Sequence, residues 1–167
     1  EQLRLLDAIW QDEHATFHGQ HYNFDDIAFS PKPYQKPRIP IWIGGEGKLA
    51  QRRAGRHGDA WFPYFVRITP RELAARFENV RGCAREAGRN PDEITFACCL
   101  PVELTPKDVS QESDYLKGSI AQITEALKKF QDVGVSHVGL QFMIPHYPER
   151  QEQIERFAKE ALPALRA

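Results

Sequence analysis

The sequence predicts an α/β protein with a parallel sheet, and three observations support this fold class. After one helical segment at the start of the chain, four short apolar runs each precede a segment with helical periodicity. The runs are apolar on both faces, as in strands that are covered on both sides. Start and stop signals separate the segments, and strict strand–helix alternation favours right-handed parallel crossovers. Four such units are half of a (β/α)8 barrel, although the pattern alone also permits an open doubly wound sheet.

The first 37 residues are expected to form a helix end and a connector. Residues 1–13 place apolar side chains such as Leu3 and Leu6 at helical spacing. Because the chain opens at Glu1 inside this pattern and without an initiator methionine, we expect it to be a piece of a longer protein. Residues 14–37 combine glycine and several prolines with aromatic side chains, which predicts an extended connector.

Residues 38–167 are expected to hold the four strand–helix units, with no internal repeat or linker between them. The strands are predicted at Ile39–Ile43, Ala60–Phe62, Ile94–Leu104 and Val138–Phe142. The helices that follow are predicted at Leu49–His57, 70–87, 119–134 and Glu149–Leu165, with a short helix or turn at Thr105–Asp108. These units form one domain, or one part of a domain.

Two of these helices begin with capping boxes. Thr69 is followed three residues later by Glu72, and Ser119 in the same way by Gln122. In such a pair each side chain accepts from the other residue's backbone N–H, which satisfies two donors that the helix itself cannot pair. The expected stop residues are Gly88 and Gly134.

The composition is that of a globular protein without a dominant charge. The 167 residues are 41% hydrophobic and 27% charged, with a formal net charge of −1. No overall field therefore favours nucleic acid or an anionic membrane as a partner. The stretch 48–89 is locally basic, but its acid–base spacing suits a solvated helical face better than a polyanion site.

The sequence also favours a cytoplasmic location. It contains no apolar run of about 18 residues and no signal peptide, so we expect no membrane span. The cysteines Cys83, Cys98 and Cys99 have no metal-ligand spacing and are odd in number. They are expected to be small apolar residues in a reducing compartment.

The strongest functional signal is the turn between the first predicted strand and its helix. Gly44, Gly45, Glu46, Gly47 and Lys48 follow an apolar run directly. Glycines let backbone N–H groups approach a ligand, and a helix start adds unpaired donors and partial positive charge, so this order suits a phosphate or carboxylate. The spacing matches neither the dinucleotide fingerprint nor a P-loop. Judged alone, a plain chain reversal explains these glycines equally well.

Other clusters of reactive side chains carry weaker signals. His14, His18 and His21 are spaced three and four apart, but a glycine interrupts the helix that a zinc site would need, so no metal site is expected. His57 and Asp59 could form an acid–base pair, although a helix-terminal histidine is more often a cap. No serine or cysteine has the surroundings of a nucleophile.

Several segments together resemble a known family. The most specific runs from Pro31 to Gly45 (PKPYQKPRIPIWIGG), and it is flanked by Trp10, Phe17–Phe24 and Gly58–Trp61. Weaker matches follow at Glu86–Pro91, Lys117–Ser119 and Gly134–Val138. This series resembles the bacterial luciferase-like monooxygenase family, whose members are FMN-dependent monooxygenases and oxidoreductases that use the deazaflavin F420. The resemblance covers nearly the whole chain but only the C-terminal half of the family's barrel.

The resemblance implies a half-barrel fold and a set of cofactor-binding residues. It implies that the loop of Gly44, Gly45, Glu46, Gly47 and Lys48 contacts the phosphate-bearing tail of FMN or F420. Many FMN members have small hydroxyl residues after the glycines, so here the contact would depend on backbone N–H groups and on Lys48. The resemblance also implies that Asp59 and Trp61 lie at the carboxyl end of a barrel strand, where such barrels bind ligands. A turn acid that accepts from backbone N–H groups is the alternative for Asp59.

The expected function is therefore that of an enzyme portion. The chain would supply the cofactor-tail loop and one pocket wall of a flavin- or F420-dependent oxidoreductase, and would turn over little alone. The alternative is a non-catalytic half-barrel that forms a homodimer or pairs with a separate N-terminal half, because open sheet edges and bare apolar faces favour association. A third reading is an unrelated open sheet that binds a phosphorylated metabolite. Strand order distinguishes it, since a barrel keeps consecutive strands as neighbours.

Overall fold

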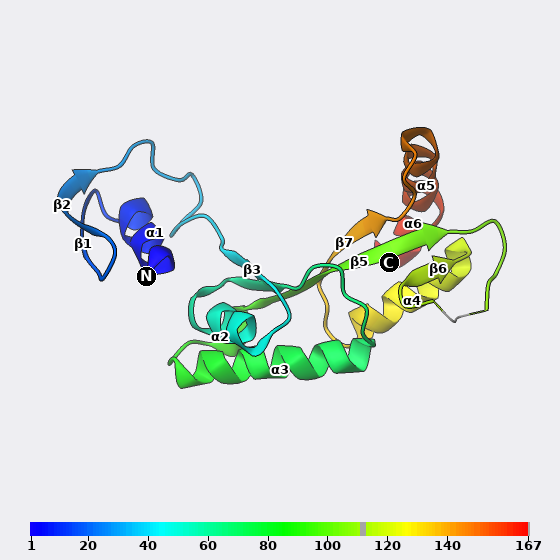
Figure 1. Ribbon diagram of the computed structural model, residues 1–167, viewed down its shortest axis with the longest axis horizontal. Coiled ribbons are helices and arrows are strands. Elements are labelled where there is room, and N and C mark those ends of the chain that lie inside the picture. The colour runs from blue at the N-terminus through cyan, green and yellow to red at the C-terminus, as the bar shows by residue number, and fades with distance from the viewer. Residues whose placement is uncertain (111–112, 167) are drawn as a thin grey trace.

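The computed structural model describes residues 1–110 and 113–166, and its N-terminal part stands apart from the main sheet (Figure 1). Helix α1 (Gln2–Gln11) packs beside an antiparallel hairpin of β1 (His14–His18) and β2 (Asn23–Ala28). The expectation of an extended connector is therefore wrong for 14–28. The hairpin forms because the rings of Phe17 and Phe24 stack across it, with centroids 6.2 Å apart.

One buried guanidinium links this N-terminal part to the main sheet. Arg38 has only 12% of its side chain exposed and forms ion pairs with both Asp7 of α1 and Asp59, which directly precedes β4 (Ala60–Phe62). Asp59 also accepts from the backbone N–H of Ile41 at 2.7 Å. Bidentate pairing of a partly buried Arg is among the stronger charge-assisted contacts, so it fixes α1 against the start of β4.

The main sheet is parallel and keeps the chain order of its principal strands. β3 (Trp42–Gly44) pairs with β4, β4 with β5 (Thr95–Leu104), and β5 with β7 (His137–Phe142). The order contains no reversal, which confirms the predicted strand order. One unpredicted strand, β6 (Leu116–Gly118), pairs with the last residues of β5.

The helices follow the strands as predicted, with two differences. They are α2 (Lys48–His57), α3 (Pro70–Glu86), α4 (Ile120–Asp132), α5 (Tyr147–Glu160) and α6 (Leu162–Arg166), with a 3-10 turn at Pro91–Glu93. Thr69 and Ser119 form the two predicted capping boxes, and Gly88 and Gly134 adopt positive φ angles of 72° and 95°. No helix starts within Thr105–Asp108, and the last predicted helix is interrupted at Ala161.

The helices cover one face of the sheet, which we call the helix face. The even-numbered residues of β5 from Phe96 to Leu104 belong to the main apolar core, which also includes helix residues such as Leu73 and Ile123. Because side chains alternate along a strand, Ala97, Cys99 and the other odd-numbered residues of β5 lie on the opposite face. We call that opposite face the inner face, since it would line the inside of a closed barrel. Across the described residues no helix is long and apolar enough to span a membrane.

Candidate functional site

The glycine loop lies where β3 ends and α2 begins. Gly45 has a φ of 91°, a conformation that side chains disfavour, and Gly47 is the N-cap of α2 without a side-chain cap bond. A Cβ added at Gly47 would meet nothing within 4 Å, so the space beside the loop is open. The first N–H groups of any helix have no partner within the helix. The loop thus presents donors to an open space.

The carbonyl groups of the loop are occupied from the protein side. The Gly45 oxygen accepts from Trp61 Nε1 at 2.9 Å, and the Glu46 oxygen accepts from Gln51 Nε2 at 2.7 Å. The Gly47 oxygen accepts from two backbone N–H groups of α2. Within the described part of the chain, the N–H groups of Gly47 and Lys48 have no recorded acceptor. A loop with engaged carbonyls and open N–H groups attracts anions.

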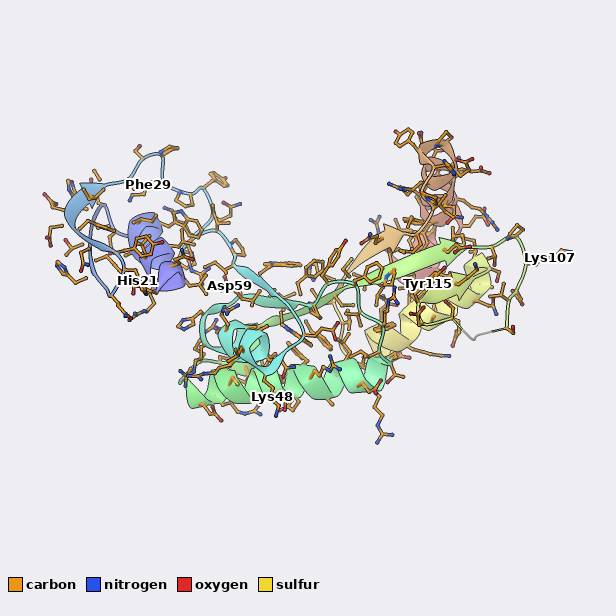
Figure 2. The ribbon with its side chains drawn as sticks, in the orientation of Figure 1. His21, Phe29, Lys48, Asp59, Lys107 and Tyr115 are labelled. Carbon is orange, nitrogen blue, oxygen red and sulfur yellow. The ribbon has the colours of Figure 1, made fainter. Side chains whose placement is uncertain are left out.

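The charged side chains of the loop are compatible with an anion. Glu46 would repel a phosphate if it were free, but its carboxylate forms an ion pair with Arg76 of α3. Lys48 is the first residue of α2, and its side chain is exposed (Figure 2). The one acid of the loop is therefore neutralised, and the one base lies at the helix start.

The expected placement of Asp59 is wrong. Asp59 lies before β4, at the amino end of the sheet and opposite Ile41, whereas the glycine loop lies at the carboxyl end of β3. Its carboxylate accepts from Arg38 and from the Ile41 N–H, as the turn-acid alternative described. Trp61 is the middle residue of β4 and is fully buried on the helix face. Its indole N–H donates to the Gly45 oxygen of the loop.

The histidines considered from the sequence lie on the N-terminal hairpin and at the end of α2. His14 and His18 lie on the hairpin, each 2.9 Å from an aspartate of the facing strand. His57 ends α2 near the amino end of the sheet; burial and then nearby positive charges lower its pKa. Cys98 is buried on the helix face, and burial raises its pKa to about 12, so the thiol stays protonated at neutral pH.

The inner face carries an aromatic group near the amino ends of β3 and β7. Trp42 of β3 lies edge-on to Phe62 of β4 at 5.6 Å and to His137 of β7 at 5.5 Å between ring centroids. Trp42 is 43% exposed although it lies in the sheet. Gly139 leaves room for the Phe62 ring, which would lie 3.3 Å from a Cβ at that position. The rings meet at interplanar angles of 62° and 86°, so they form an apolar wall rather than one plane, and such walls line pockets for organic ligands.

Polar groups replace the aromatic ones towards the carboxyl ends of the strands. Tyr64 donates from its hydroxyl to Gln141 of β7. Further along, Glu103 of β5 accepts from Tyr115 Oη at 2.7 Å and contacts Lys117 Nζ at 2.8 Å. Glu103 and Lys117 are register partners in the parallel β5–β6 pair, which places both side chains on the same face.

The contacts within the cluster of Glu103, Tyr115 and Lys117 shift the pKa of each member. Burial alone would raise the pKa of Glu103, but the hydrogen bonds from Lys117 and Tyr115 lower it on balance. The bond to Glu103 raises the pKa of both Tyr115 and Lys117. At neutral pH the cluster is therefore a carboxylate, an ammonium and a neutral phenol. The sequence prediction missed it, because its members lie on two strands and β6 has only three residues.

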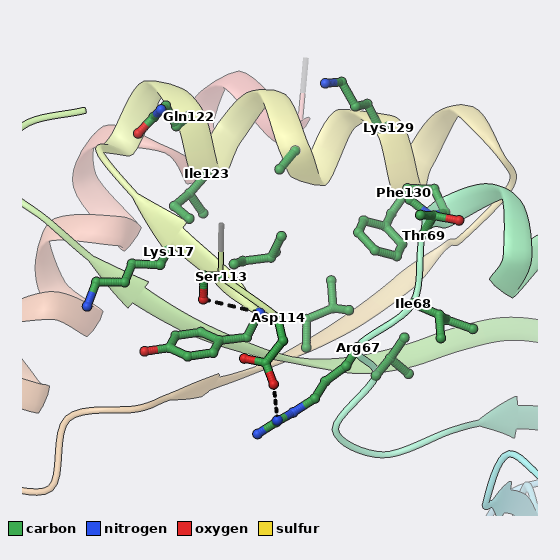
Figure 3. A pocket seen from close by; sticks show the side chains of 16 residues that line it. Arg67, Ile68, Thr69, Ser113, Asp114, Lys117, Gln122, Ile123, Lys129 and Phe130 are labelled. Atoms are coloured by element: carbon green, nitrogen blue, oxygen red, sulfur yellow. Dashed lines mark hydrogen bonds and ion pairs between the residues drawn. The ribbon is translucent and has the colours of Figure 1, made fainter. Parts of the chain in front are cut away.

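A cavity of about 300 Å³ adjoins this cluster and extends towards α4 (Figure 3). Its apolar lining includes Leu100, Ile123 and Phe130, and its rim includes Arg67 paired with Asp114. In Figure 3 the Lys117 ammonium points away from the apolar side chains of α4. Tyr115 and Lys117 of the cluster nevertheless line this cavity too, so the cluster borders it.

Comparisons with known proteins agree on one family. The family model described as luciferase-like monooxygenase matches residues 1–161. A phthiodiolone/phenolphthiodiolone dimycocerosates ketoreductase of Mycobacterium tuberculosis is 26% identical over 95% of this chain and 44% of its own length. An FMNH(2)-dependent dimethylsulfone monooxygenase of Pseudomonas putida is 39% identical over 37% of this chain and 17% of its own. The chain spans about half the length of the ketoreductase relatives that it matches.

Solved structures show the same fold in larger proteins. An F420-dependent secondary alcohol dehydrogenase matches with a TM-score of 0.80 and 19% identity, over 99% of this chain and 60% of that protein. A coenzyme F420 dependent tetrahydromethanopterin reductase of Methanopyrus kandleri matches with a TM-score of 0.76 and 14% identity, over 98% and 61%. The parallel arrangement of the four principal strands, with helices on one face, therefore corresponds to half of a barrel.

Proposed function

Because the chain belongs to the luciferase-like monooxygenase family, we propose that it supplies the C-terminal half-barrel of an oxidoreductase that uses FMN or F420. The loop from Gly44 to Lys48 binds the phosphate-bearing tail of that cofactor. The observation that carries this proposal is the state of the loop, whose carbonyls are engaged by the protein while its N–H groups remain open. Such a loop stabilises an anion without a hydroxyl side chain.

The inner face performs the rest of the role assigned to this half. The aromatic group around Trp42 and Phe62 covers one side of a flat ring and excludes water from it. When bound, the cofactor supplies the hydride or oxygen chemistry, and the protein orients it. The N-terminal half of the barrel is needed to enclose the opposite side, so the isolated chain is expected to bind cofactor weakly and to turn over little.

A charge placed at Gly47 tests the loop. Gly47→Asp adds a carboxylate beside the open N–H groups, and we expect on the order of tenfold weaker binding of FMN, because the carboxylate repels the phosphate. The affinity for riboflavin, which lacks the phosphate, should be unchanged. Aspartate is a favoured N-cap residue and φ at Gly47 is −69°, so the stability of the fold should not fall. Flavin fluorescence titration measures both affinities.

Gly82→Asp is the matched control for that substitution. A Cβ at Gly82 of α3 meets only the end of the Arg85 side chain at 3.9 Å, so the same charge is added without crowding. FMN and riboflavin should bind Gly82→Asp as they bind the unaltered chain. Equal losses for FMN and riboflavin in Gly47→Asp would show that the loop does not contact the phosphate. The same comparison can be made between F420 and its chromophore without the phosphate.

A second candidate function is a non-catalytic half-barrel that associates with a copy of itself or with a separate N-terminal half. It is favoured by the exposure of the inner face, where Trp42 is 43% and Tyr64 59% exposed. β3 and β7 also end the order of the principal strands, so their outer edges lack a parallel neighbour among the described strands. Bare edges and apolar faces favour association.

Sedimentation tests this association. We expect the chain to sediment as a dimer at about 50 μM, and Trp42→Glu to shift it to the monomer, since a buried carboxylate at the centre of the interface is costly. Leu49→Glu is the control, because Leu49 is 75% exposed on the outer surface of α2. A monomer that persists as the concentration rises to about 1 mM would contradict this second function.

A further inference from the structure

The inner face contains one charged cluster whose hydrogen-bonding capacity is only partly used. Lys117 has three N–H donors, and among the described residues Glu103 is its one recorded acceptor, at 2.8 Å. Tyr115 donates its own hydrogen to Glu103, so its oxygen still has lone pairs to accept with. The side chain of Lys117 is 37% exposed. A donor and an acceptor thus remain available side by side.

The position of the cluster points to a ligand. Glu103 is the last inner-face residue of β5, close to its carboxyl end, and Lys117 lies beside it on β6. In barrels of parallel strands, ligands bind at the carboxyl ends of the strands. The glycine loop follows the carboxyl end of the shorter strand β3, which the registers place level with Ala97, so the cluster lies about 20 Å further along the strand direction than the loop.

The charge balance selects the kind of ligand. The carboxylate of Glu103 compensates the ammonium of Lys117 at close range, so the pair is neutral as a whole. An anionic ligand group would gain attraction from Lys117 but suffer repulsion from Glu103. A neutral oxygen meets no such repulsion and can accept from the ammonium. A hydroxyl can in addition donate to Tyr115.

We propose that Lys117 and Tyr115 form a substrate subsite for a neutral carbonyl or hydroxyl oxygen, with Glu103 as the positioning residue that orients both. This proposal rests on the proposed oxidoreductase function, since it places the oxygen of a ketone or alcohol substrate on the inner face. A purely structural bond between β5 and β6 is the competing explanation. The backbone pairing of residues 102–104 with 116–118 already joins these strands, so the cluster is not needed for that purpose.

Titration of the isolated 167-residue chain with two shape-matched probes tests the subsite, since all three side chains belong to this chain. The probes are cyclohexanone, which has a neutral carbonyl, and cyclohexanecarboxylate, which has an anion. Side-chain NMR resonances of Lys117 and Tyr115 report binding. We expect cyclohexanone to shift both and to bind more tightly than the carboxylate. Lys117→Met should weaken the ketone about tenfold, because a hydrogen bond from a charged donor is lost.

Three further variants separate the subsite from a structural role. Lys128→Met removes an exposed lysine of α4 and should leave ketone binding unchanged. Tyr115→Phe should weaken cyclohexanol more than cyclohexanone, since only the alcohol donates to the Tyr115 oxygen. Glu103→Gln keeps a hydrogen-bond acceptor but removes the charge, so it should reverse the preference and favour cyclohexanecarboxylate. A structural bond predicts no change of preference.

Defined results would overturn the proposal. They are equal ketone affinity in Lys117→Met and the unaltered chain, tighter binding of the carboxylate to the unaltered chain, or an unchanged preference in Glu103→Gln. The amide resonance of Leu116 shows whether β6 stays paired in each variant, and Glu103→Gln remains informative if Lys117→Met loses that pairing. FMN titration of the same variants should be unaffected. A chain that binds cyclohexanone but not FMN would refute the cofactor proposal alone.

Discussion

Gly55→Ala is expected to destabilise the fold by about 3 kcal/mol, since the added methyl group has no room. Gly55 lies where α2 crosses α3, and a Cβ there would be 2.4 Å from the Val80 carbonyl oxygen and 2.7 Å from Cys83 Cβ. The Val80 oxygen is part of a helix backbone and cannot rotate away. The two helices would have to separate, which would expose apolar side chains of the core. Urea denaturation measures the change in the free energy of unfolding.

Gly82→Ala is the matched control for this prediction. Gly82 also lies within a helix, but a Cβ there has only the Arg85 side chain within 4 Å, at 3.9 Å. Alanine should therefore stabilise α3 by about 0.5–1 kcal/mol through its higher helix propensity. If Gly55→Ala is as stable as Gly82→Ala, the close crossing of α2 and α3 is not present in solution.

Trp61→Phe is expected to have two effects of different kinds. Trp61 is fully buried and stacks on Phe96 with centroids 6.0 Å apart, and its indole donates to the Gly45 oxygen. Loss of ring volume and of that donor should lower the free energy of unfolding by about 2 kcal/mol. The freed Gly45 carbonyl should also let the loop reorient. We therefore expect the affinity for FMN to fall about fivefold relative to the affinity for riboflavin, which corresponds to the net free energy of about one hydrogen bond.

Phe96→Leu provides the control for Trp61→Phe. Phe96 lies in the same aromatic stack, 4.1 Å from the Phe77 ring, but makes no contact with the glycine loop through a polar atom. Its replacement should destabilise the fold to a similar degree and leave the ratio of FMN to riboflavin affinity unchanged. A changed ratio in Phe96→Leu would mean that loss of core packing, and not the indole bond, controls the loop.

Local signals account for the parts of the fold that the sequence predicted. Capping boxes at Thr69 and Ser119 and glycine stops at Gly88 and Gly134 each depend on a few neighbouring residues, and the structure confirms them. The hairpin of β1 and β2 was missed because its strands are exposed and polar over much of their length, so they lack the alternation of a half-buried strand.

Some features of the candidate site could be predicted from neighbouring residues in the sequence, whereas others depend on how the elements pack. The glycine loop is continuous in sequence, so its position between strand and helix was predictable, whereas anion binding by the loop stays a prediction. The engagement of Gly45 and Glu46 carbonyls by Trp61 and Gln51 was not, because it depends on how β4 and α2 pack. Asp59 was placed at the wrong end of its strand, because the resemblance assigned its segment to a carboxyl end although the strand predicted at Ala60–Phe62 begins directly after it. Glu103 and Lys117 meet only through the register of β5 and β6.

The order of the strands has a consequence for how the chain folds. Each principal strand pairs with the next principal strand, so every one of these pairs is closed by a crossover that belongs to this chain. The register partners Trp42–Ala60, Ala60–Thr95 and Ala97–His137 are 18, 35 and 40 residues apart, and closing segments of that length makes parallel sheets slow to form. The other half of a barrel is therefore not needed to specify the path of this one. Under the proposed function its part is to shield the inner face, which concerns chemistry and solubility rather than topology.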